Sequence, residues 1–234
     1  MKISKTTNVK PADLNYDHYT RNQYDRDIVN AIPFHKEIHM QIADYVVAHF
    51  PEDKPLAVAD MGAGTALTSA VIKSVLPRAR FDIVDFSRQM LKGAKKKMGT
   101  KNTHYILADY AAMKFDKKYD IIVMVIGLHH QTAAGAKALI KKVYRNLNNG
   151  GIFILGDLVT YTDKNKAARC NALHYKHLAD NASNEKVLTE WAYHHMFLND
   201  LKTLENYLKW TREAGFRIDW KFNRLNTALI IGKK

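Results

Sequence analysis

A glycine-rich loop after the first apolar run of the chain has the composition of a ligand-binding turn. Its sequence is Asp60-Met61-Gly62-Ala63-Gly64-Thr65-Ala66, between the apolar run 56–59 and a helical pattern over 65–76. Glycine lets the backbone approach a ligand closely, and the first N–H groups of a helix can bind a carboxylate. The loop therefore predicts a small-molecule site where a strand meets a helix.

Two phosphate-binding motifs fit this loop poorly. The dinucleotide fingerprint Gly-x-Gly-x-x-Gly would need a glycine at the position of Leu67, and the P-loop needs Gly-Lys followed by Ser or Thr, which is not found here. The loop is therefore not obviously built for a pyrophosphate.

Three acidic residues stand at the ends of three successive predicted strands: Asp60, Asp85 and Asp109. In an open α/β sheet, ligands bind at these carboxyl ends, where Asp85 suits the paired hydroxyls of a ribose. Asp109 is placed to accept from an adenine amino group, and Asp60 to lie near a positive charge. Three acids suit a cationic nucleoside better than a polyanion. The alternative that each acid only caps the following helix stays open.

Apolar runs alternate with helical patterns along most of the chain. Strands are predicted at 56–59, 81–84, 105–107, 121–126, 152–155, 216–222 and 227–231. This alternation predicts an α/β fold, a Rossmann-like seven-stranded mostly parallel sheet with helices on both faces. The short connection between the last two strands makes them an antiparallel pair, so one edge strand is expected to be antiparallel.

Together these motifs resemble the class I S-adenosylmethionine (SAM)-dependent methyltransferases, and among them the small-molecule enzymes. The matching segments are 58–66, 83–91, 107–110, 119–130 and 146–153. Ala66 stands where many members have a third glycine, a mild departure because only a small side chain is needed there. The resemblance implies SAM as cofactor. The residues expected to bind it are Tyr24, Asp60, Gly62, Ala63, Gly64, Asp85, Phe86, Met90, Ala108, Asp109, Tyr110 and Ile126.

The same resemblance suggests how the chain is divided. We expect an N-terminal lid segment at 1–34, a SAM-binding α/β core at 35–158 and a helical cap insertion at 159–203. A C-terminal helix and β-hairpin at 204–234 would complete the core. In the cap, His174, Tyr175, His177, His194 and His195 are candidates to face a substrate.

Four residues are the candidate catalytic groups: His129, His130, Tyr16 and Asp157. Histidine titrates near neutral pH, so either His129 or His130 could act as a base, or could simply form a local hydrogen bond. Tyr16 lies in an aromatic segment that also holds Tyr24, which either closes over the cofactor or packs as an ordinary helix. No metal site is predicted, because no cysteine or acid completes a ligand set around the histidines.

The leading hypothesis is methyl transfer to a nitrogen or oxygen of a small molecule. The first alternative is a SAM-consuming enzyme with a non-methyl outcome, either intramolecular cyclisation of SAM or carboxylated-SAM chemistry, whose pocket should leave no room for a second substrate. The second is an RNA-directed or non-catalytic SAM-fold binding protein. Nucleic acid is disfavoured because Gly127-Leu128-His129-His130 differs from the motif of DNA amino-methylating enzymes, although RNA is not excluded.

The composition of the chain indicates which compartment and partners to expect. The 36 Lys and Arg against 23 Asp and Glu give a net charge of +13, but the basic residues are spread along the chain. The single cysteine, Cys170, cannot form an internal disulfide, which favours a reducing cytoplasm. The N-terminus lacks a secretory signal and no apolar run could cross a bilayer, so no membrane association is expected. A monomer or homodimer is expected.

Overall fold

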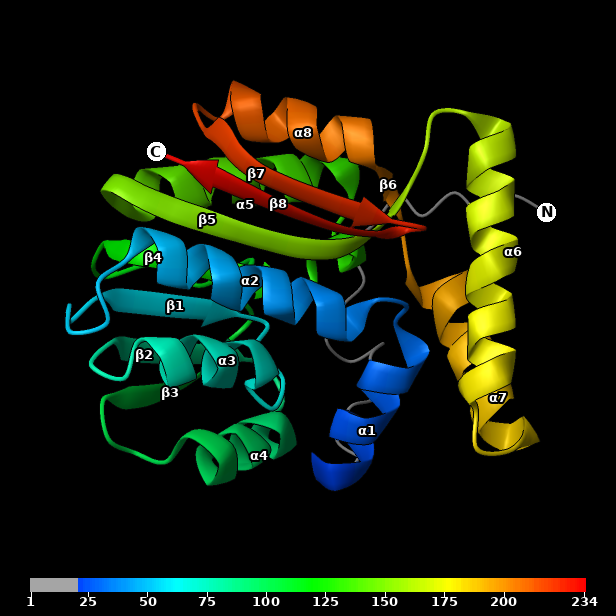
Figure 1. Ribbon diagram of the computed structural model, residues 1–234, viewed down its shortest axis with the longest axis horizontal. Coiled ribbons are helices and arrows are strands. Elements are labelled where there is room, and N and C mark those ends of the chain that lie inside the picture. The colour runs from blue at the N-terminus through cyan, green and yellow to red at the C-terminus, as the bar shows by residue number, and fades with distance from the viewer. Residues whose placement is uncertain (1–20) are drawn as a thin grey trace.

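The fold is a twisted sheet covered by helices on both faces, with a further group of helices beyond one end of its strands (Figure 1). The computed structural model describes residues 21–234. The strands are β1 (Ala57–Met61), β2 (Arg80–Asp85), β3 (Thr103–Leu107), β4 (Tyr119–Val125), β5 (Leu147–Thr160), β6 (Lys202–Thr203), β7 (Arg217–Arg224) and β8 (Thr227–Lys233). The α-helices are α1 (Arg21–Ala31), α2 (His35–His49), α3 (Leu67–Val75), α4 (Arg88–Met98), α5 (Ala133–Asn146), α6 (Lys164–Asn181), α7 (Glu185–Tyr193) and α8 (Leu204–Glu213).

The strand order is β3-β2-β1-β4-β5-β8-β7, and β6 pairs with the end of β5. The first five strands are mutually parallel, and β8 runs antiparallel to both of its neighbours. The predicted fold class is therefore confirmed. The antiparallel strand lies one place in from the edge, which β7 forms, and the two-residue β6 adds an eighth strand that the sequence pattern did not predict.

Two apolar cores explain why the central strands are apolar on both faces. On one face, α2, α3 and α4 pack on the sheet through side chains such as Ile42, Ile72 and Ala94. On the other face, α5 and α8 pack through Ile140 and Tyr207, among others. A strand covered on both sides buries every side chain, which accounts for the continuous apolar run of β4.

The order of the strands fixes where a ligand can bind. From β1 the chain turns outward to β2 and β3, and then crosses to β4 on the other side of β1. The loops that follow β1 and β4 therefore diverge and open a crevice at the carboxyl ends of the strands. Both predicted chemical motifs, the glycine loop and the pair of histidines, lie in these two loops.

Further helices stand over this crevice. After β5 the chain forms α6 and α7, then a π-helical turn (His194–Leu198), and returns at β6, where Val159 pairs with Lys202. These helices and α1 stand beyond the carboxyl ends of the strands (Figure 1). They occupy the residues predicted to form the cap and part of the lid. None of the described helices is long and apolar enough to cross a membrane.

Candidate active site

The glycine loop after β1 is held open by its backbone conformation. Gly62 and Gly64 have φ angles of 72° and 54°, in the left-handed region that favours glycine. A Cβ atom at Gly62 would lie 3.1 Å from the ring of Tyr110, and one at Gly64 would lie 3.4 Å from the ring of Tyr24. The N–H of Gly62 donates to the carbonyl of Val84 at 2.9 Å, which ties the loop to the end of β2. The loop therefore needs glycine for both conformation and space.

Asp60 is a buried carboxyl beside this loop. It is 1% exposed, and the hydroxyl of Ser69 donates to its Oδ2 at 2.6 Å. Burial raises the pKa of Asp60 to about 7, against the lowering effect of the Ser69 hydrogen bond and with a further increase from the charge of Asp85. A buried carboxyl of this kind would be stabilised in its ionised form by a nearby cation.

Asp85 links the loops after β1 and β2. Its Oδ2 accepts from the N–H of Gly64 and its Oδ1 from the N–H of Ser87, each at 2.8 Å. Asp109 likewise accepts from the N–H of Ala111 at 2.8 Å. Both acids thus support local turns, as the capping alternative expects. Each carboxylate oxygen has a second lone pair, so these bonds do not prevent a ligand from donating to the same acids.

The other residues predicted to bind the cofactor lie around the same strand ends. Phe86 is half-buried and Met90 is 3% exposed at the start of α4, where Ser87 caps the helix. The N–H of Ala108 donates to the carbonyl of Asp85 at 3.0 Å, which joins the ends of β3 and β2. The hydroxyl of Tyr110 donates to the carbonyl of Gly127 at 2.9 Å. Tyr16 lies outside the described residues.

Two cavities meet beside the glycine loop. The smaller one, about 30 Å³, touches Gly62, Ala63 and Thr65. The larger one, about 110 Å³, extends under α6 and α7, and we call it the acceptor cavity. Tyr24, Ile28 and Ile126 line both, so the two spaces are neighbours. Ile126 has a φ of 57° at the end of β4.

His129 and Asp157 form a buried pair in the wall of the acceptor cavity. Nδ1 of His129 lies 2.5 Å from Oδ1 of Asp157, and both side chains are 1% exposed. The N–H of Leu158 donates to the same oxygen at 3.0 Å, and the hydroxyl of Tyr207 donates to Oδ2 at 2.9 Å. Because Asp157 accepts from Nδ1–H, Nε2 of His129 is the nitrogen with the available lone pair. This arrangement can take a proton from a bound molecule.

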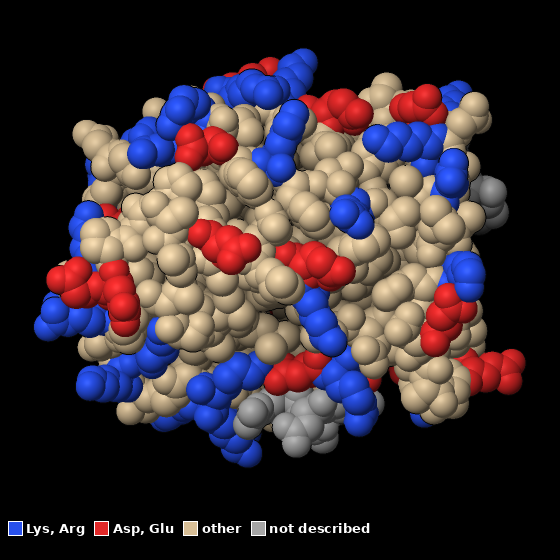
Figure 2. Space-filling view, in the orientation of Figure 1, with Lys and Arg blue, Asp and Glu red and all other residues tan. Residues whose placement is uncertain are grey.

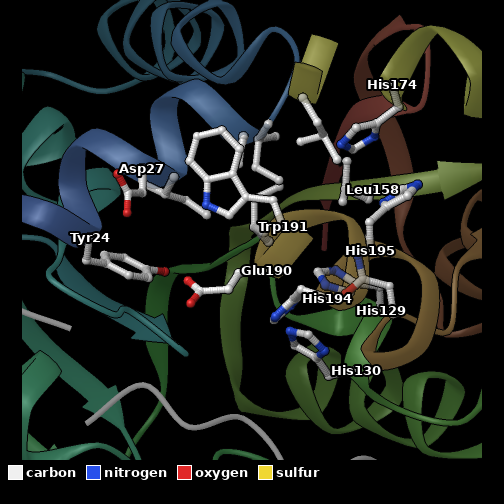
Figure 3. A pocket seen from close by; sticks show the side chains of 16 residues that line it. Tyr24, Asp27, His129, His130, Leu158, His174, Glu190, Trp191, His194 and His195 are labelled. Carbon is white, nitrogen blue, oxygen red and sulfur yellow. The ribbon is translucent and has the colours of Figure 1, made fainter. Parts of the chain in front are cut away.

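Four more histidines surround this pair (Figure 3). The ring of His130 lies 4.0 Å from that of His129, and the ring of His194 lies 5.7 Å from that of His130. The rings of His174 and His195 lie 4.0 Å apart. No three described His, Cys, Asp or Glu residues are grouped as ligands for a metal ion.

The structure thus brings together some predicted residues and adds others. Of the cap candidates, His174, His194 and His195 line the acceptor cavity, whereas Tyr175 and His177 are not among the residues that line it. Tyr207, which holds Asp157, was not predicted, because a tyrosine within an amphipathic helix gives no signal of its partner. Asp27, Glu190 and Trp191 were also missed, since nothing in their local sequence distinguishes a cavity wall from a helix face.

Residues 58–151 match the family described as a methyltransferase domain. A carboxy-S-adenosyl-L-methionine synthase from Ruthia magnifica is 24% identical over 208 residues, which are 86% of each chain. A malonyl-[acyl-carrier protein] O-methyltransferase from Bacillus anthracis is 20% identical over 65% of this chain and 51% of its own. The solved structure of an O-methyltransferase family protein from Burkholderia thailandensis superimposes with a TM-score of 0.66 at 15% identity, over 92% of this chain and 59% of that one.

Proposed function

The chain belongs to the class I SAM-dependent methyltransferases, and we propose that it transfers the methyl group of SAM to an oxygen or nitrogen of a small molecule in the acceptor cavity. The observation that carries the proposal is the buried His129–Asp157 pair, whose available nitrogen belongs to a cavity adjoining the glycine loop. A buried histidine held by a carboxylate is suited to remove a proton from a nucleophile.

The glycine loop and the buried acid fit SAM. The smaller cavity touches Gly62 and Ala63, so a ligand there would reach the backbone of the loop, and Asp60 gains its charge more readily beside a cation. When bound, SAM supplies an electrophilic methyl carbon on a sulfonium. We propose that Asp85, Asp109 and Phe86 hold the ribose and the adenine, as the resemblance of their motifs implies.

The chain contributes alignment and proton transfer. During the transfer, Nε2 of His129 would receive the proton of the nucleophile. Asp157 then stabilises the imidazolium, while Tyr207 and the N–H of Leu158 keep the carboxylate in place. Tyr24 and Ile28 of α1 lie over the junction of the two cavities and would exclude water there.

A second candidate is carboxylated-SAM chemistry, favoured by the alignment to a carboxy-SAM synthase over 86% of both chains. Two features support methyl transfer instead. The acceptor cavity adds about 110 Å³ of space beyond Ile126, next to the cavity at the glycine loop, and this is where a second molecule would bind. Moreover, no lysine or arginine lines it among the described residues, so no cation there would bind a carboxylate.

On the face drawn in Figure 2, the surface charge gives little support to an RNA-directed role. Figure 2 shows lysine and arginine scattered over one face, with acidic residues between them, and no continuous basic patch on that face. Nucleic-acid binding relies on a concentrated positive surface, which a net charge of +13 alone does not provide. We therefore expect a small-molecule acceptor.

The proposal is tested by tracing a labelled methyl group from SAM to its product. The protein is incubated with methyl-labelled SAM, with and without a fraction of small metabolites, and the products are separated by mass spectrometry. We expect labelled small molecules together with S-adenosylhomocysteine, and a rate that falls about 10²- to 10⁴-fold in His129→Ala. His104→Ala, a change at a histidine whose side chain is 80% exposed, is the matched control. A carboxylated SAM product, or full activity in His129→Ala, would contradict the proposal.

A further inference from the structure

The charged groups that line the acceptor cavity are acidic. Among the described residues that line it, Asp27 of α1 and Glu190 of α7 carry charge, and there is no lysine or arginine. Arg26 lies 3.7 Å from Asp27, but its side chain is 69% exposed and points its charge toward solvent rather than the cavity wall. The two carboxylates come from different helices, so their convergence is a property of the assembled cavity.

Two buried histidines of this cavity, His174 and His195, do not offset the acids. Burial lowers the pKa of His174 to about 3, and the neighbouring histidines lower it further. Burial likewise lowers the pKa of His195 to about 4, with a contribution from His129. Both rings are therefore neutral at neutral pH.

His195 provides an independent sign of a ligand. Its Nε2 lies 3.0 Å from Oδ1 of Asn171, so Nε2 carries the proton and Nδ1 is an acceptor. Nδ1 is buried in a residue that is 7% exposed, and it has no hydrogen-bond partner. Asn171 lines a different cavity, whereas His195 lines the acceptor cavity. Oδ1 of Asn199, in the same wall, is also buried without a partner.

Aromatic rings stand beside the two acids. In Figure 3, Tyr24 and Asp27 lie on one side of the cavity and His129 on the other, and Glu190 and Trp191, which is 8% exposed, lie between them. The faces of indole and phenol rings attract organic cations. Trp191 is buried, whereas Glu190 is exposed. Carboxylates and aromatic faces together suit an ammonium group better than a metal ion.

We infer that the acceptor molecule carries an ammonium group, bound by Asp27 and Glu190 against Trp191, and a second N–H or O–H donor that meets Nδ1 of His195. The ammonium end would lie away from His129, so the nucleophile belongs to the other end of the molecule. This inference rests on the proposed function, because it assigns the same cavity to the acceptor.

The test compares three phenols whose para side chain ends in an ammonium, in no charged group or in a carboxylate: tyramine, para-ethylphenol and phloretate. Their binding is measured by calorimetry at neutral pH with S-adenosylhomocysteine saturating the cofactor site. We expect tyramine to bind at least about tenfold more tightly than either of the others, as a charge-assisted hydrogen bond supplies. Equal affinities, a preference for phloretate, or no binding of tyramine would overturn the inference.

Two variants test whether Glu190 and Asp27 are responsible for the preference for tyramine. Glu190→Gln and Asp27→Asn should each reduce the preference for tyramine several-fold, and unchanged binding of S-adenosylhomocysteine shows that they are folded. Glu185→Gln, an exposed change on the same helix, should leave the preference intact. Methyl transfer without any preference for a cation would refute this inference alone. A preference for tyramine in a protein that transfers no methyl group would refute the proposed function instead.

Discussion

Asp60→Asn isolates the energetic effect of the buried carboxyl beside the glycine loop. Burial raises the pKa of Asp60 to about 7 in the folded protein, from 3.8 for an exposed aspartate. In the unfolded chain the group loses its proton at the lower value. The folded state therefore binds the extra proton between pH 3.8 and about 7, and its stability falls as the pH rises through that window.

The size of the effect follows from the gap between the two pKa values. Each pKa unit corresponds to about 1.4 kcal/mol, so the gap amounts to about 4 kcal/mol of unfolding free energy. Asparagine keeps the oxygen that accepts from Ser69 and removes the charge. In the protein without SAM, Asp60→Asn should therefore leave the free energy of unfolding nearly unchanged at acidic pH. At alkaline pH it should raise the free energy of unfolding by up to about 4 kcal/mol.

Urea unfolding at a series of pH values measures this difference directly. The free energy of unfolding of the variant minus that of the parent should increase across the window, because all other titrating groups cancel. The exposed Asp53→Asn serves as the control for the same substitution at the surface. If the difference for Asp60→Asn does not change with pH, the carboxyl is not held in its protonated form and the reasoning is wrong. Calorimetry completes the test, since cationic SAM should bind the parent more tightly as the pH rises through 7 and should lose that dependence in the variant.

Two more predictions concern the cofactor site. Asp85→Ala should weaken SAM binding about tenfold or more, since it removes an acceptor proposed for the ribose, while circular dichroism stays native; unchanged affinity by calorimetry would refute the assignment. Gly62→Ala should destabilise the protein by about 1–3 kcal/mol and impair SAM binding, because a side chain at a φ of 72° is strained and its Cβ would lie 3.1 Å from Tyr110. Normal thermal unfolding and normal affinity in this variant would show that the loop tolerates a side chain.

The fold could be predicted well from sequence because its signals are local. Each of the parallel strands is a short apolar run followed by a turn, and the acids at residues 60, 85 and 109 mark three of the strand ends. The strand β5 extends from Leu147 to Thr160, well beyond the apolar run 152–155, since pairing with β4, β8 and β6 orders residues that have no strand pattern of their own. Tertiary pairing thus overrides local propensity there.

The candidate site could be predicted only in part, because its chemistry depends on contacts distant in sequence. His129 and Asp157 were each candidates, but their pairing spans 28 residues and Tyr207 lies 50 residues further along. The acids of the acceptor cavity come from α1 and α7, which approach each other only after the chain has folded. The positions of Asp27 and Glu190 in the sequence do not predict that both line the same cavity.

Selection for stability and selection for activity would favour different residues at the position of Ile126. A β-branched residue at a φ of 57° is held in a poorly populated conformation, at a cost of about 1–3 kcal/mol. A glycine there would relieve this strain, but it would remove a side chain from the wall that the two cavities share. Selection for stability alone would replace this isoleucine, whereas selection for catalytic turnover would keep it. The residue at this position in relatives from hot environments would therefore show which of the two has been stronger.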